Sequence, residues 1–290
     1  MDKLNYEVII KNFVEYAEDL EIIRAVMIVG SRAREDKPAD EWSDLDLVIF
    51  TADLKVHLNN TQWLNKIGKP YITFLEKTAV GGSTERRVLF ENGLDVDFSF
   101  FPLDTFNSLN TNNEVINVLA KGVKVLVDKD GRLTDLIKST HISAENSEVP
   151  NQEELSNMMQ DFYYHAVLTA KKLRRGEIMT GKSICDNYMK SLLVNMIKIH
   201  TKLLRGVHFN TWHGFRFFEE WADPSIVKEF KRIYSYYDEN DVWRALEGTM
   251  EVFDTIANAV CLRTNIKYPI ESSNYAFELI RLYKESRHYV

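Results

Sequence analysis

Two apolar segments separated by a polar interval constrain the fold of the first half of the chain most strongly. Residues 26–29 form a continuous apolar run that ends at Gly30, which is typical of a buried strand. The second segment, residues 42–50, alternates between polar and apolar residues from Ser43 onward, and Asp44 and Asp46 stand two residues apart in it. Because side chains at i and i+2 leave the same face of a strand, this pattern predicts two neighbouring carboxylates.

Such a pair of carboxylates is a candidate magnesium site. The two negative charges repel each other, and the repulsion raises one pKa unless a cation lies between them. Mg²⁺ is a hard ion that prefers carboxylate oxygens. Solvated acidic pairs are also common at strand ends, so Asp-x-Asp alone leaves that alternative open. Gly30 and Ser31 favour a site for metal and phosphate, because glycine permits close backbone approach and a serine can cap a helix or bind an anion at its N-terminus.

An EF-hand calcium loop is a competing interpretation of the same segment. Asp40, Ser43, Asp44 and Asp46 all offer oxygen ligands. That loop, however, requires a glycine in its middle and further oxygen donors beyond it, whereas residues 47–50 are apolar. The spacing therefore argues against a calcium loop.

A predicted hairpin supplies a third carboxylate. Alternating segments lie on both sides of Asn92 and Gly93, and Asn-Gly is the strongest short-range hairpin signal. Asp95 and Asp97 share one face of the second strand, and either could join the first pair. Asp97 lies deeper in the sheet, whereas Asp95 lies near the turn. A two-residue turn would place Arg86 on the same face.

These motifs resemble the signature of the polymerase β-type nucleotidyltransferases, in which Gly-Ser, then Asp-x-Asp, then a third carboxylate follow one another. Within that superfamily the chain resembles the aminoglycoside 6-adenylyltransferases, which modify streptomycin, and the resemblance extends over nearly the whole chain. The segments that carry it are Gly30-Ser31-Arg32, Trp42-Ser43-Asp44-Leu45-Asp46 and Asp95-Val96-Asp97-Phe98.

The resemblance implies transfer of AMP from ATP to the 6-hydroxyl of streptomycin, with release of pyrophosphate and antibiotic resistance as the result. It implies that the catalytic residues and magnesium ligands are Asp44, Asp46 and Asp97. The expected nucleotide-binding residues are Gly30, Ser31, Arg32, Ser43 and Lys171. A polycationic acceptor needs acidic walls, and the carboxylates available for them are Asp95, Asp161, Asp186, Glu219 and Glu220. An exposed side chain on a helix is the alternative for Arg32 and Lys171. The same alternative holds for Asp161, Asp186, Glu219 and Glu220.

Composition limits the class of protein and its partners. The hydrophobic content of 45% and the charged content of 27% are those of a globular protein, and 290 residues suffice for two domains. The net charge of -7 argues against a nucleic-acid partner and suits a cationic small molecule. Cys185 and Cys261 are expected to be buried thiols rather than a disulfide. No signal peptide or membrane span is predicted, so we expect a cytoplasmic protein without a membrane partner. A monomer is the simplest expectation.

The predicted fold class is α+β, with an N-terminal nucleotidyltransferase domain at 1–145 and an all-α helical bundle at 146–290. The first domain is expected to contain a mixed β-sheet with flanking helices, and the second to bind the acceptor. The boundary lies in the polar segment 138–151. Helices are predicted at 3–20, 53–68, 102–121, 152–175 and 182–204, with shorter or later ones near 215–222, 224–237, 240–263 and 272–287. A short helix is predicted from Arg32, and the buried stripe of the helix at 182–204 is predicted to be Ile184, Tyr188, Leu192, Met196 and Ile199.

Three other functions remain open at this point. The same chemistry could act on another small molecule or on a protein. The chain could be a nucleotide-binding protein without catalysis, although three intact carboxylates argue against it. It could also be an interaction protein whose helical half binds a partner, which would leave the carboxylate pattern unexplained.

Overall fold

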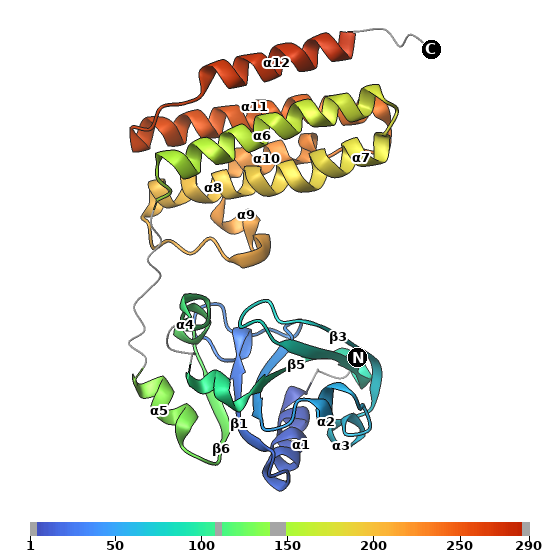
Figure 1. Cartoon of the computed structure of the whole chain (residues 1–290), viewed down its shortest axis with the longest axis vertical. Helices are drawn as coiled ribbons and strands as arrows, with labels where there is room; N and C mark the ends of the chain where they lie inside the picture. Colours follow the sequence, from blue (N-terminus) through green and yellow to red (C-terminus); the bar gives the residue numbers. More distant parts are fainter. Residues whose placement is uncertain (1–4, 108–111, 140–148, 286–290) are drawn as a thin grey trace. The chain divides into compact units, whose positions relative to one another are not determined.

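The computed structural model describes residues 5–107, 112–139 and 149–285. These residues belong to two compact units, which lie within Met1–Glu145 and Asn146–Val290 and are described separately (Figure 1). The predicted boundary between residues 145 and 146 falls outside the described residues.

The first unit is built on a six-stranded sheet with the order β3-β4-β5-β2-β1-β6. Strands β2 and β5 are parallel, and the other neighbours are antiparallel. The sheet is therefore mixed, which confirms the predicted fold class. The strands are β1 (Ile23–Val29), β2 (Leu45–Thr51), β3 (Pro70–Lys77), β4 (Thr84–Phe90), β5 (Leu94–Pro102) and β6 (Lys124–Asp128).

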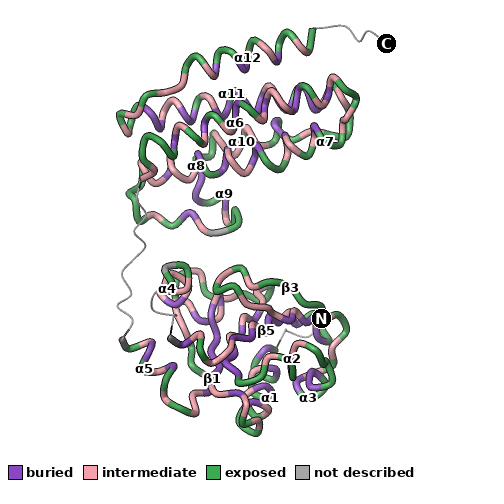
Figure 2. The backbone as a smooth tube through the Cα atoms, in the orientation of Figure 1, coloured by how far each residue is buried: buried purple, intermediate pink, exposed green. Residues whose placement is uncertain are grey.

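The two faces of the sheet differ in what covers them. One face packs its apolar side chains against α1 (Tyr6–Asp19), α2 (Lys55–Leu58) and α3 (Leu64–Ile67), and the strands beneath these helices are largely buried (Figure 2). The opposite face has a smaller apolar core, to which α4 (Asn113–Ala120) and α5 (Arg132–Ser139) contribute. The rest of that face carries the polar residues of β2, β4 and β5, and these form the candidate site.

The helix predicted at 53–68 is wrong, because this segment forms only the two single turns α2 and α3. Asn60 separates them: its side-chain oxygen accepts the Gln62 amide at 2.7 Å, and its carbonyl accepts the Trp63 indole at 2.9 Å. Asparagine competes in this way with the helical hydrogen bonds of the backbone.

Two further helix predictions in this unit need correction. The helix expected to begin at Arg32 is a single 3₁₀ turn, Gly30–Arg32. The helix expected at 102–121 is interrupted, since β5 continues to Pro102, a 3₁₀ turn follows at Leu103–Asn107, and α4 begins only at 113. Asn112 caps α4 by accepting the amide of Glu114 at 2.9 Å, which sets the later start. Residues 108–111 of that prediction lie outside the described part.

The second unit contains no strand among its described residues, as predicted. Its core comes mainly from α6, α8 and α11, whose inner faces are buried (Figure 2). The elements are α6 (Gln152–Arg174), α7 (Ile178–Ser183), a π-helical segment (Ile184–Met189), α8 (Lys190–Arg205), α9 (Phe218–Trp221), α10 (Pro224–Ile233), α11 (Glu239–Thr264) and α12 (Ile270–Glu285), with a 3₁₀ turn at His213–Phe215.

In the buried stripe predicted for the helix at 182–204, Met196 is confirmed, whereas Ile184, Tyr188 and Leu192 each lie one residue before a buried position. The stripe observed is Cys185, Met189, Leu193, Met196 and Ile197, whereas Tyr188 is 42% exposed. The buried residues Cys185, Met189, Leu193 and Ile197 keep the spacing of four that the prediction used, although Ile184–Met189 is π-helical. The prediction therefore had the right period and began it one residue too early.

Two smaller expectations concern the cysteines and the membrane. Cys185 and Cys261 are both buried and free, as predicted. No helix of the described ranges is long and apolar enough to span a bilayer.

Candidate active site

The parallel pairing of β2 and β5 brings three aspartates together. It places Asp46 directly beside Asp97, and Asp44 lies just before β2. Each of the three offers a carboxylate oxygen, and these oxygens all lie within 4.8 Å of one another. Asp97 is 7% exposed and the other two are half-buried. We call these three residues the aspartate cluster. Hard oxygen donors at this spacing fit a divalent cation such as Mg²⁺.

Gly30 lets the turn after β1 lie against this cluster. Its φ is +69°, in the left-handed region that favours glycine. A Cβ atom at this position would lie 2.1 Å from Oδ2 of Asp46, closer than any real contact. The absence of a side chain at Gly30 therefore leaves room for the carboxylate of Asp46.

Ser31 has a buried hydroxyl without a hydrogen-bond partner. It does not cap a helix as predicted, since the turn at Gly30–Arg32 is short and has no side-chain cap. A buried polar atom without a partner is rare and calls for an explanation. A ligand atom beside the aspartate cluster would satisfy this hydroxyl, which fits the predicted contact with phosphate.

Arg32 and Ser43, both predicted to bind nucleotide, are found bracing the loop before β2. Arg32 donates to the carbonyl of Asp44 at 2.8 Å and to that of Ser43 at 2.7 Å, and its guanidinium stacks 3.6 Å from the centre of the Tyr6 ring. The Ser43 hydroxyl donates to Asp40 at 2.8 Å. These contacts hold the backbone that carries Asp44.

Arg87 contacts the aspartate cluster, and the sequence analysis missed it. Its Nε donates to Oδ1 of Asp97 at 2.7 Å, and its Nη1 donates to Glu76 at 3.1 Å. Burial raises the pKa of Asp97 to about 6, while Arg87 opposes this rise. Burial also raises the pKa of Asp95, which lies two residues before Asp97 on β5.

The prediction that Arg86 shares a face with the aspartates is wrong. The hairpin closes at the pair Phe90 and Leu94, so the turn has three residues and Arg87, not Arg86, lies opposite Asp97. Arg86 points to the other face, where it is buried and donates to the carbonyls of His57 and Leu58. Matching the apolar positions would have revealed this, because Phe90 and Leu94 share a face only across an odd-numbered turn.

The residues predicted in the helical unit do not form a single cluster. Asp161 accepts the Tyr188 hydroxyl at 2.8 Å and lies 2.7 Å from Nδ1 of His165. Lys171 is exposed and lines a groove of about 360 Å³ between α6 and α12, with Tyr164 and Tyr275 among its neighbours.

The other acidic candidates lie near α8 and α9. Asp186 is almost buried between Lys182 and Lys190, and the Ser235 hydroxyl donates to it at 2.9 Å. Glu219 is exposed and, together with Asp186, lines a pocket of about 660 Å³. Glu220 is also exposed.

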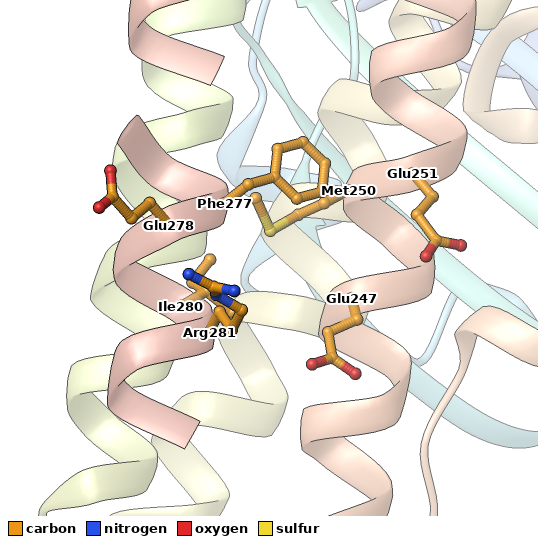
Figure 3. A pocket seen from close by; sticks show the side chains of 7 residues that line it. All are labelled: Glu247, Met250, Glu251, Phe277, Glu278, Ile280 and Arg281. Atoms are coloured by element: carbon orange, nitrogen blue, oxygen red, sulfur yellow. The ribbon is translucent and has the colours of Figure 1, made fainter. Parts of the chain in front are cut away.

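A further groove of about 550 Å³ lies between α11 and α12 and contains none of the predicted site residues (Figure 3). Phe277 and Met250 point toward each other between the two helices (Figure 3). An ion pair between Lys284 of α12 and Glu247 of α11, at 2.8 Å, also connects the helices. This arrangement is that of a packed helix pair with a charged rim.

The comparison with protein families decides the assignment of the chain. The sequence model of the family described as streptomycin adenylyltransferase matches residues 4–281. The chain belongs to this family. As a member of the streptomycin adenylyltransferase family, it is a nucleotidyltransferase, as the sequence analysis predicted.

Curated relatives agree with the family. An aminoglycoside 6-adenylyltransferase of Bacillus subtilis is 25% identical over 267 residues, covering 89% of this chain and 90% of the relative. One from Campylobacter jejuni is 22% identical over 279 residues, covering 94% and 93% respectively. Among solved structures, an aminoglycoside 6-adenyltransferase from Bacillus subtilis matches with a TM-score of 0.48 and 20% identity, covering 98% of this chain and all of that one.

Proposed function

We propose that this member of the streptomycin adenylyltransferase family transfers AMP from ATP to a hydroxyl of an aminoglycoside, the 6-hydroxyl of streptomycin, and so confers resistance to the antibiotic. The observation that carries the proposal is the aspartate cluster, whose oxygens lie within 4.8 Å of one another beside the Gly30–Arg32 turn. The names of the curated relatives support the acceptor class.

The three aspartates would hold magnesium, which when bound neutralises charge on the triphosphate and favours departure of pyrophosphate. The unpartnered hydroxyl of Ser31 and the close backbone at Gly30 bind phosphate oxygens beside the cluster. Lys171 is a second candidate for contact with the triphosphate.

Asp97 is suited to accept the proton of the acceptor hydroxyl. Its carboxylate lies beside Asp46 on the neighbouring strand, so it is placed where the acceptor hydroxyl would meet the α-phosphate. Once Asp97 accepts this proton, the acceptor oxygen forms a bond to the α-phosphorus. The bond from the α-phosphorus to the bridging oxygen breaks, and pyrophosphate leaves with that electron pair.

Acidic residues would bind the cationic groups of the acceptor. Asp95 lies beside the cluster on β5, and Asp161, Glu219 and Glu220 offer accessible or half-buried carboxylates in the helical unit. Asp186 contributes least to this role, since Lys182 and Lys190 already neutralise it.

Pyrophosphate release from MgATP, measured with a panel of aminoglycosides that includes streptomycin, tests the proposal. We expect release with streptomycin, a product heavier by one adenylyl group in mass spectrometry, and loss of both when EDTA removes the metal. Release with a different acceptor would assign the same chemistry to another substrate. No release with any acceptor, together with intact ATP binding in calorimetry, would make the chain a non-catalytic nucleotide-binding protein.

Variants of the aspartate cluster give the matched comparison. Asp46→Asn and Asp97→Asn should each lower kcat by at least ~10²-fold, since each removes a charge that acts on the reacting phosphate. Glu21→Gln is the control, because Glu21 is an exposed carboxylate of the same unit and pairs with Arg24 outside the site. Near-normal turnover in Asp46→Asn would contradict the metal assignment.

A further inference from the structure

Arg87 connects the aspartate cluster to the neighbouring strand. It lies on β4 directly opposite Asp97 of β5, and its guanidinium reaches Glu76 of β3 on its other side. Glu76, Arg87 and Asp97 thus form a row across the adjacent strands β3, β4 and β5, with the guanidinium of Arg87 between the two carboxylates.

The contact with Arg87 occupies one oxygen of Asp97. Nε of Arg87 donates to Oδ1 at 2.7 Å, and none of the described residues donates a hydrogen bond to Oδ2. This charge-assisted hydrogen bond restricts the orientation of the Asp97 carboxylate. The second oxygen then remains available for a cation or for the proton of an acceptor.

The surrounding charge explains why the residue that binds Asp97 is an arginine. Asp95, Asp97 and Glu85 lie near Arg87, and they add to the negative potential of Asp44 and Asp46. A guanidinium stays protonated there and offers several donors in a rigid plane, so it can hold Asp97 and Glu76 together. A lysine ammonium would supply the charge without this planar geometry.

We infer that Arg87 is a positioning residue for the reaction proposed above: it orients Asp97 through Oδ1 and is itself oriented by Glu76. This inference rests on the proposed function. Because the inferred role of Arg87 is exerted through Asp97, its loss should affect the chemical step more than the binding of nucleotide.

The test compares Arg87→Met with Arg24→Met in the full chain, using steady-state pyrophosphate release. Arg24 is a matched control, because it also bridges two carboxylates, Asp130 and Glu21, and its side chain is 25% exposed against 32% for Arg87. We expect Arg87→Met to lower kcat by ~10²-fold, as displacement of a catalytic group by about 1 Å does. The KM for MgATP should change less than about threefold, and Arg24→Met should keep its kcat.

A conservative variant separates positioning from folding. Arg87→Lys should recover about tenfold of the lost kcat, because the charge returns without the planar contact. Should Arg87→Met fail to fold in circular dichroism, Glu76→Gln replaces it, with an expected three- to fivefold decrease in kcat that supports the inference. Equal kcat values for Arg87→Met and Arg24→Met, or a loss confined to KM, would overturn the inference. A wild-type chain that releases no pyrophosphate with any acceptor would instead refute the proposed function.

Discussion

Gly30 and Asp46 cannot both keep their positions if residue 30 gains a side chain, because its Cβ would lie 2.1 Å from Oδ2 of Asp46. The backbone of Gly30 also has a φ of +69°, which L-amino acids with side chains adopt only at a cost of about 1 kcal/mol. The glycine of the Gly-Ser pair thus determines the space that the Asp46 carboxylate occupies on the neighbouring strand β2.

Replacing Gly30 by alanine should therefore damage catalysis more than stability. We expect Gly30→Ala to lower kcat by ~10²-fold, because Oδ2 of Asp46 must move by roughly 1 Å to clear the new Cβ, and such a displacement is enough for this loss. Pyrophosphate release measures the effect. Gly131→Ala is the control, because Gly131 has a φ of +72° but open space around it, so it reproduces the backbone strain alone. Equal activities in the two variants would contradict the proposed contact.

The burial of His57 should make the stability of the first unit depend on pH. This histidine is fully buried between Phe100 and Tyr16, and burial lowers its pKa from 6.5 to about 4. The unfolded chain therefore binds a proton more readily than the folded one between these two values. Stability should fall as the pH decreases from about 6.5 to about 4, by at most ~3 kcal/mol, and His57 should add no further dependence below that.

Urea unfolding of the wild type and of His57→Gln, measured at several pH values, isolates this contribution. The variant should be less stable at pH 7.5 because it loses the contact with Tyr16, but its free energy of unfolding should depend less on pH between 4 and 6.5. Parallel curves for the two proteins would show that His57 has the same pKa in the folded and unfolded chain, and would contradict the prediction.

Arg86 and Arg87 are neighbours in sequence and should differ in what they support. Arg86 is buried and donates to the carbonyl of His57 at 3.1 Å, to that of Leu58, and to the Thr73 hydroxyl at 3.2 Å. Arg86→Met should destabilise the first unit by ~2 kcal/mol, because buried carbonyls lose their donors, while kcat of the folded fraction should stay close to wild type. Thermal unfolding combined with pyrophosphate release distinguishes this result from the kcat defect expected for Arg87→Met.

Lys190 should be important for the stability of the helical unit. It is 3% exposed, lies 3.7 Å from Oδ1 of Asp186, and donates to the Thr249 hydroxyl at 2.7 Å. Lys190→Met would remove one of the two cations beside Asp186 and the donor to the Thr249 hydroxyl, and it should destabilise the unit by ~3 kcal/mol in urea unfolding. Lys231→Met, at an exposed position of α10, should change stability by less than ~0.5 kcal/mol. Equal effects would mean that the buried ion pair is energetically neutral.

The central strands and the pairing of carboxylates could be predicted from the sequence because they rest on short-range patterns. Alternation around Asp44 and Asp46 predicted a strand, and Asn92-Gly93 predicted the hairpin that carries Asp97. The parallel pairing of β2 and β5, which makes Asp46 a neighbour of Asp97, is a long-range relationship. The resemblance to a known family implied that a third carboxylate joins the first two, but not how the strands pair.

The predictions failed where a difference of one residue changes which side chains share a face. One extra residue in the turn at Glu91–Gly93 exchanged Arg86 for Arg87. The buried stripe of the helix at 182–204 was begun at Ile184 rather than at Cys185, and at a constant spacing of four that error carries through to Leu192. The roles of Arg32 and Ser43 in bracing the loop depend on three-dimensional contacts with Tyr6 and Asp40, and no spacing in the sequence indicates them.

The parallel alignment of β2 with β5 also governs the order in which the protein can become active during synthesis. Residues 52–93 separate these two strands, and β3 and β4 lie among them. A nascent chain that ends before residue 94 holds Asp44 and Asp46 but has no β5 to place beside them. About a third of the polypeptide must therefore emerge from the ribosome before the three carboxylates can meet. A product truncated earlier can have no functional reaction centre, however well its first helix and strands fold.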